Sequence, residues 1–247
     1  MRSYNLGYIT DQDLFDHVKE TVEKYRFRID LKRFNKNLVD PIKLTFDTKV
    51  YAKSIEEIVE SEIIRQIDKS NTNHIGYFHQ NIFKYIDPAW TVPKQGFDLV
   101  NEEEKIYVEI KNKHNTMNSA SSQRTYMKMQ AMLLKDAKNR CMLVEVIAKK
   151  SQNVPWQVSI DGESHKHEFI RRVSMDRFYE LVTGEKDAFK RLCEVLPAVL
   201  DDVMDEFSEH PIDNTVFKEL QELSPNLLKS LYLLSFSRYE GFNTFQL

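Results

Sequence analysis

Apolar and polar residues alternate along residues 96–113, on both sides of an acidic segment at residues 101–104. An alternation with a period of two predicts two β-strands joined as a hairpin. Successive side chains of a strand point to opposite faces, so the second strand has an apolar and a charged face. The apolar face carries Ile106, Val108 and Ile110, and the other face carries Tyr107, Glu109, Lys111 and Lys113.

A helical period of apolar residues appears in several other segments. It predicts helices over residues 11–26, 54–70, 74–86, about twenty residues after 118, 175–182, 187–207, and two short ones between 215 and 236. The unbroken apolar run 142–148 predicts a central strand that is covered on both faces. Residues 156–160 and 169–173 predict a second hairpin, and residues 42–51 fit a strand or a loop.

This order of helices and strands predicts an α/β fold, a mixed sheet with helices on its faces. At 247 residues the chain is long enough for one sizeable domain. We expect a single domain made of an N-terminal helical or irregular region (1–50), a core (51–185) and a helical C-terminal subregion (186–247).

Two carboxylates of the first hairpin are predicted to share a small site. If the turn has an even number of residues, Asp98 falls opposite Tyr107 and diagonal to Glu109, on the face that also carries Lys111. Mg²⁺ prefers carboxylate oxygens, and an adjacent lysine can position an attacking water and screen charge on phosphorus. The pattern therefore fits phosphodiester hydrolysis, although charged residues on the solvated face of an ordinary hairpin would produce it too.

Glu62 is a candidate third metal ligand. It falls inside the apolar face of the helix predicted over 54–70, and carboxylates are rarely buried unless they are paired or bind a metal. The alternative is that Glu62 only flanks the core at a solvated edge. Glu145, inside the apolar run 142–148, has a similar ambiguity between the cleft and a structural ion pair.

A run of small polar residues follows the hairpin and leads into a helix, for which Asn118 or Ser119 is the expected cap. Free N–H groups at a helix start bind phosphate oxygens, and amides can read base edges. The overall net charge is −3, but residues 105–140 hold eight basic and two acidic residues, which would attract a polyanion. The residues expected to contact DNA are Lys113, His114, Asn115, Asn118, Ser119, Ser122, Arg124 and Lys128.

No apolar run approaches the length of a membrane span, and the first residues lack the apolar core of a signal peptide. We therefore expect a cytoplasmic protein with no membrane contact. Hydrophobic residues make up 41% of the chain and charged residues 30%, as in a globular protein. With only six glycines, no glycine-rich nucleotide-binding loop is present.

With these motifs identified, the sequence resembles the type II restriction endonucleases that cut at GGNCC, a family within the PD-(D/E)XK nuclease superfamily. The resemblance is carried by residues 74–81 (HIGYFHQN), 96–98 (GFD) and 109–118 (EIKNKHNTMN), and it extends to about residue 205. Phe97 stands where the motif's proline would precede the aspartate.

The resemblance implies a restriction-endonuclease-like core with a helical C-terminal part, and a Mg²⁺-dependent enzyme that cuts double-stranded DNA. It implies a homodimer on a palindromic site, with a companion methyltransferase protecting the host DNA. Asp98 and Glu109 match the metal-binding acids, Lys111 the catalytic lysine and Glu62 a helix glutamate of the superfamily. The alternatives are a structure-specific repair or junction-resolving nuclease of the same superfamily and a non-catalytic DNA-binding module.

Overall fold

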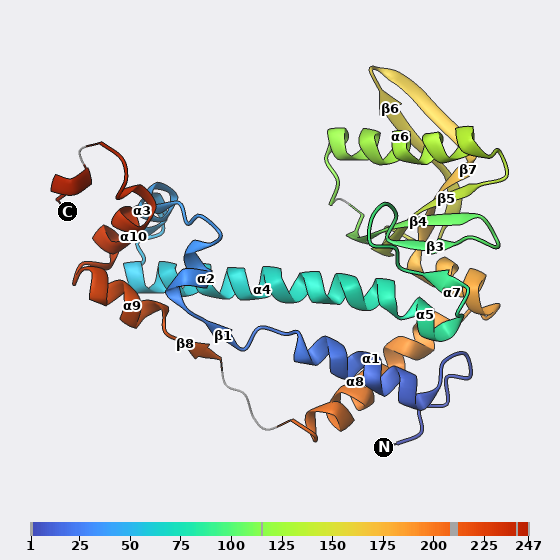
Figure 1. The fold of residues 1–247 in the computed structure, drawn as a ribbon, viewed down its shortest axis with the longest axis horizontal. Helices are drawn as coiled ribbons and strands as arrows, with labels where there is room; N and C mark the ends of the chain where they lie inside the picture. The colour runs from blue at the N-terminus through green and yellow to red at the C-terminus, as the bar shows by residue number, and fades with distance from the viewer. Residues whose placement is uncertain (1, 115, 208–211, 241, 247) are drawn as a thin grey trace. The chain divides into compact units, whose positions relative to one another are not determined.

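A computed structural model describes residues 2–114, 116–207, 212–240 and 242–246 (Figure 1). The chain divides into two compact units. The sheet unit comprises Met1–Glu23 and Ile75–Phe207, and the helical unit comprises Lys24–His74 and Ser208–Leu247. Helix α4, Ile55–Asn81, contributes to both. Each unit is thus assembled from segments that are distant in the sequence.

A six-stranded mixed sheet forms the centre of the sheet unit, in the order β2-β3-β4-β5-β7-β6. Its strands are β2 (Trp90–Thr91), β3 (Leu99–Asn101), β4 (Ile106–Lys113), β5 (Arg140–Ile147), β6 (Asn153–Ile160) and β7 (Glu163–Ser174). The central strands β4, β5 and β7 pair in parallel, and the outer pairs are antiparallel. Residues Cys141 to Glu145 of β5 are all buried, as expected of a strand covered on both faces.

Helices cover both faces of this sheet (Figure 1). Helices α6 (Ser119–Lys135) and α7 (Met175–Thr183) pack against the sheet, and α5 (Phe83–Ile86) contacts β2. Helix α8 (Ala188–Met204) packs against α7 and against α1 (Asp11–Glu23). Helix α6 packs Tyr126 and Met129 against Leu143 and Ile170 of the sheet. On α7, Phe178 contacts the rings of Phe83 and Trp90 at centroid distances of 4.8 and 5.4 Å. The expected α/β class, a mixed sheet flanked by helices, is confirmed.

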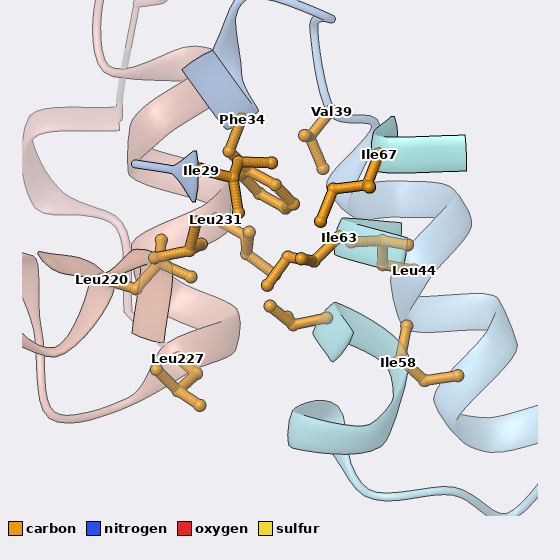
Figure 2. Packing of buried hydrophobic residues seen from close by; sticks show 12 residues of the cluster. Ile29, Phe34, Val39, Leu44, Ile58, Ile63, Ile67, Leu220, Leu227 and Leu231 are labelled. Atoms are coloured by element: carbon orange, nitrogen blue, oxygen red, sulfur yellow. The ribbon is translucent and has the colours of Figure 1, made fainter. Parts of the chain in front are cut away.

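The helical unit has its own hydrophobic core (Figure 2). It contains β1 (Arg28–Ile29), α2 (Leu31–Asn35), α3 (Pro41–Val50), the first part of α4, β8 (Asp213–Asn214), α9 (Val216–Leu223), α10 (Leu227–Phe236) and the 3₁₀ turn Phe242–Thr244. Ile29, Phe34, Leu220 and Leu231 are fully buried in this core. Two segments far apart in sequence therefore need each other to bury their apolar side chains.

Some elements differ from those expected. The helices predicted over 54–70 and 74–86 are one helix, α4, followed by the short α5. Residues 42–51, expected as a strand or a loop, lie mostly in helix α3, because Asp40 accepts hydrogen bonds from the backbone N–H groups of Ile42 and Lys43 and Pro41 occupies the first turn. The expectation of a single domain stays a prediction.

The other predicted elements are present. The second hairpin turns at Asp161 and Gly162, both with positive φ (52° and 87°), which suits a tight two-residue turn. In the part of the chain that the structure describes, no helix is both long and apolar enough to cross a lipid bilayer.

Candidate active site

The first hairpin forms with a different register from the one expected. Leu99 pairs with Val108 and Val100 with Tyr107, so the pairing is shifted by two residues and Asp98 does not face Tyr107. The cause is the turn. The side chain of Asn101 accepts a hydrogen bond from the backbone N–H of Glu104 at 3.0 Å, and Lys105 takes a positive φ of 55°. Because a shift of two preserves the alternation, Asp98 and Glu109 still share a face.

Asp98 directly precedes β3 and is held by two hydrogen bonds to β4. Its backbone N–H donates to the carbonyl of Val108 at 2.9 Å, and its carboxylate accepts from the backbone N–H of Ile110 at 2.8 Å. Burial raises the pKa of Asp98, and the negative charge of Glu109 raises it further. The carboxylate is thus fixed in place beside a second acid that repels it.

Glu109 lies between two lysines. Its Oε1 atom is 2.7 Å from Nζ of Lys111, and its Oε2 atom is 2.8 Å from Nζ of Lys128. Burial raises the pKa of Glu109, but the hydrogen bonds and charges of the two lysines outweigh it and hold the pKa below its usual range. Glu109 is therefore ionised at neutral pH.

Lys128 reaches this site from helix α6. Its ammonium also donates to the carbonyl of Gly96 at 2.8 Å and lies 4.1 Å from the ring centroid of Phe97. Expected as a DNA contact, Lys128 lies beside the two acids, which the sequence pattern did not reveal because α6 follows the hairpin as a separate element. Asp98, Glu109, Lys111 and Lys128 thus form one cluster of two acids and two cations, called the hairpin cluster below.

The donor set of the hairpin cluster fits a divalent cation in part. Among the described residues no group of three or more His, Cys, Asp or Glu side chains is arranged to hold a metal ion, so the protein offers the pair Asp98 and Glu109. A cation between these carboxylates would remove the repulsion that raises the pKa of Asp98. Mg²⁺ commonly binds through one or two carboxylates and completes its shell with waters and phosphate oxygens.

Glu62, the candidate third ligand, belongs to the helical unit. Both of its carboxylate oxygens accept hydrogen bonds from Arg65 at 2.6 Å, and Oε1 also accepts from Gln66 at 2.9 Å. Burial raises the pKa of Glu62, but these bonds and charges lower it overall. Arg65 and Gln66, one turn further along α4, therefore pair with the Glu62 carboxylate, which explains how an acid is tolerated within an apolar helix face.

Two relatives and a family model relate the chain to known proteins. It is 34% identical to the type II restriction enzyme Sau96I of Staphylococcus aureus over 214 residues, 82% of each chain. It is 32% identical to the type II restriction enzyme Eco47II of Escherichia coli over 214 residues, 81% of this chain and 89% of that protein. The model of the Eco47II restriction endonuclease family matches residues 6–205. The chain belongs to this family. Its expected class, a type II restriction endonuclease, is thereby confirmed.

In this Eco47II family member, the residues expected to contact DNA fall into two groups. Lys113, Asn118, Ser119 and Arg124 are exposed, whereas His114 and Ser122 are half-buried. Asn118 caps α6, since its side chain accepts a hydrogen bond from the backbone N–H of Ser121 at 2.9 Å. Asn115 lies outside the described residues.

His114 and Ser122 line a pocket of about 330 Å³ together with Met117, Trp156 and Arg172. Behind it, Glu145 is almost completely buried, at 1% exposure, and its carboxylate binds Arg172 and, at 3.1 Å, Nδ1 of His114. Glu145 therefore takes the structural role that the sequence left open. Its partners lie on other strands and loops, so no local pattern could identify them.

The Nδ1 atom of His114 has two competing neighbours. It lies 3.1 Å from the Glu145 carboxylate and 2.8 Å from Nη2 of Arg172. A ring nitrogen either donates to the carboxylate or accepts from the guanidinium, so the protonation of Nδ1 decides which of the two it binds. In this restriction endonuclease, the buried carboxylate of Glu145 thus links His114, which directly follows β4, to Arg172 of β7.

Proposed function

We propose that this chain hydrolyses phosphodiester bonds in double-stranded DNA at a short palindromic sequence, GGNCC, with Mg²⁺ as its cofactor. The observation that carries the proposal is the hairpin cluster, where Asp98 and Glu109 lie on one face of the hairpin with Lys111 bound to Glu109. Its occurrence in a member of a restriction endonuclease family supports cleavage over simple binding.

In this proposal Asp98 and Glu109 hold the metal ion, which supplies a Lewis acid for the scissile phosphate. Lys111 and Lys128 occupy the two carboxylate oxygens of Glu109, so a metal ion held there would take the place of one of these ammonium groups. Lys111 then orients the attacking water and offsets the negative charge that develops on phosphorus. Lys128 stays anchored by the carbonyl of Gly96 and positions Glu109.

The residues around the start of α6 are proposed to bind the duplex. Lys113 and Arg124 supply charge for the backbone, and Asn118, Ser119 and Ser122 supply hydrogen-bonding groups beside a helix N-terminus. His114 and Asn115 complete the proposed set. Glu62 stays a proposed third acid, and any role in catalysis requires it to exchange Arg65 for a metal ion.

Digestion of plasmid DNA with Mg²⁺ tests this function. We expect discrete fragments, and sequencing of their ends should place every cut within GGNCC. Ragged ends, or products that appear only with branched DNA, would instead indicate a structure-specific nuclease of the same superfamily. Failure of the wild-type protein to cut any DNA with Mg²⁺ or Mn²⁺ would leave a binding module.

We also propose a homodimer, because a two-fold symmetric site is matched by a two-fold symmetric protein. Light scattering of the protein with a GGNCC duplex in Ca²⁺ should give two chains per duplex. A companion methyltransferase acting on the same sequence would protect host DNA, and methylation of the plasmid by such an enzyme should block cutting.

Replacing Asp98 with asparagine is expected to raise the thermal unfolding midpoint of the metal-free protein at neutral pH. A carboxyl whose pKa is raised by folding destabilises the fold in its charged form, and that penalty is present at pH values above its folded pKa. Asparagine removes the charge and keeps an oxygen for the N–H of Ile110. The midpoint is measured by circular dichroism.

Mg²⁺ should raise the midpoint of the wild-type protein by binding the folded state, and should raise that of Asp98→Asn much less. The matched control is Asp136→Asn, which removes an acid that pairs with Lys105 at the far end of β4. Asp136→Asn should respond to Mg²⁺ like the wild type. An Asp98→Asn variant that is stabilised by Mg²⁺ as strongly as the wild type would contradict the proposed ligand.

A further inference from the structure

The helical unit carries a basic pocket that the proposed cleavage chemistry does not use. The pocket has a volume of about 670 Å³. Its lining includes five cations, Lys24, Arg26, Arg28, Arg33 and Lys36. None of the described residues that line it is acidic. The pocket lies entirely within one unit, because all of its lining residues belong to Lys24–His74.

The local fold explains why the cations gather there. Ile29 of β1 and Phe34 of α2 are fully buried in the core of the helical unit. While Ile29 and Phe34 are buried, the neighbouring Arg28, Arg33 and Lys36 are exposed and line the pocket. Asp30, the acid within this segment, caps α2 by accepting a hydrogen bond from the backbone N–H of Arg33 at 2.8 Å.

Three of these cations, Arg26, Arg33 and Lys36, have no carboxylate partner among the residues that the structure describes. Arg28 pairs with Asp213 at 3.1 Å, in an ion pair whose two side chains are largely exposed. Like charges gathered without counter-charges repel each other and disfavour the compact state, whereas a bound polyanion would remove that repulsion.

We propose that the basic pocket binds phosphates of the DNA backbone, as a contact additional to the hairpin cluster. This rests on the proposed function for the identity of the polyanion. A guanidinium group can donate two parallel hydrogen bonds to the oxygens of one phosphate, and the pocket holds three arginines that can do so. The amide of Asn37, also in the lining, already donates to Gln66 at 2.8 Å. The pocket therefore adds affinity for any duplex and does not select a sequence.

The salt dependence of duplex binding tests this site. The test variant is Arg26→Gln, Arg33→Gln and Lys36→Gln combined, and the matched control is Lys49→Gln, Lys53→Gln and Lys218→Gln. The control removes the same charge from exposed lysines of the same unit outside the pocket. Binding of a GGNCC duplex and of a scrambled duplex is measured by fluorescence anisotropy in Ca²⁺ over a range of salt concentrations.

The slope of log K against log salt concentration is negative, and each lost phosphate contact should reduce its magnitude by about 0.9. We therefore expect the pocket variant to lose about 2–3 units of slope on both duplexes, with equal weakening of the two. The slope of the control variant should change by less than the value of one phosphate contact, about 0.9. A pocket variant whose slope matches the control overturns the proposal, as does weakening confined to the GGNCC duplex.

Cleavage by the wild type separates this site from the nuclease assignment. If the wild type cuts GGNCC and the slopes of the two variants match, the pocket proposal fails alone. If the wild type cuts nothing and the pocket variant loses slope, the pocket stands as a DNA-binding site and the nuclease proposal fails. Should the triple variant not fold by circular dichroism, Arg33→Gln alone, at an exposed position, should reduce the magnitude of the slope by about one contact.

Discussion

Replacing Lys111 with methionine is expected to lower the single-turnover rate of DNA cleavage about 10²–10⁴-fold, the usual loss when a positioned proton-transfer or charge-stabilising group is removed. Methionine keeps most of the length of the side chain and lacks the ammonium that binds Glu109 at 2.7 Å. Because the missing charge acts mainly in the transition state, duplex binding in Ca²⁺ should change little. Quenched-flow digestion at saturating enzyme measures the rate.

Lys138→Met is the matched control for Lys111→Met. Lys138 is an exposed lysine in the loop before β5. Lys138→Met removes the same charge from the same basic stretch, so any loss of cleavage rate caused by weaker attraction of DNA appears in both variants. If Lys111→Met cuts as fast as Lys138→Met, Lys111 has no part in catalysis.

Replacing Glu145 with alanine is expected to destabilise the protein by about 3–5 kcal/mol, because it leaves the guanidinium of Arg172 without its buried counter-charge. Glu145 has a side-chain exposure of 1% and Arg172 of 23%. For a chain of this size each kcal/mol lowers the thermal midpoint by about 2–4 °C, so a fall on the order of 10 °C should follow. Differential scanning calorimetry measures the midpoint.

Glu168→Ala provides the matched control for Glu145→Ala. Glu168 pairs with the neighbouring Arg171, but its side chain is 70% exposed. Ion pairs in solvent contribute little to stability, so the midpoint of Glu168→Ala should stay close to the wild type. Equal midpoints for Glu145→Ala and Glu168→Ala would show that the buried acid is dispensable.

Local pattern was sufficient to predict the faces of the first hairpin and to place Asp98, Glu109 and Lys111 on one of them. It did not predict the register, because that depends on the hydrogen bond from Glu104 to the side chain of Asn101 and on the left-handed backbone of Lys105. The faces were still correct, since the actual pairing differs from the expected one by an even number of residues.

Contacts between distant segments could not be predicted in the same way. Lys128, which binds Glu109, lies nineteen residues further along the chain, on a helix. Arg172 and Glu145, which bind each other, are separated by twenty-seven residues in the sequence. A period of apolar residues carries no information on such pairs. The burial of Glu145 gave a partial signal, because an acid inside an apolar strand needs a buried partner.

The position of the metal ion in the protein tests the central claim most directly. A crystal of the wild type with a GGNCC duplex and Mn²⁺ would locate the metal by its anomalous scattering. We predict a peak bound by a carboxylate oxygen of both Asp98 and Glu109, with Lys111 beside the scissile phosphate. A metal ion bound elsewhere in the protein, with these two acids still paired only to lysines, would contradict the assignment.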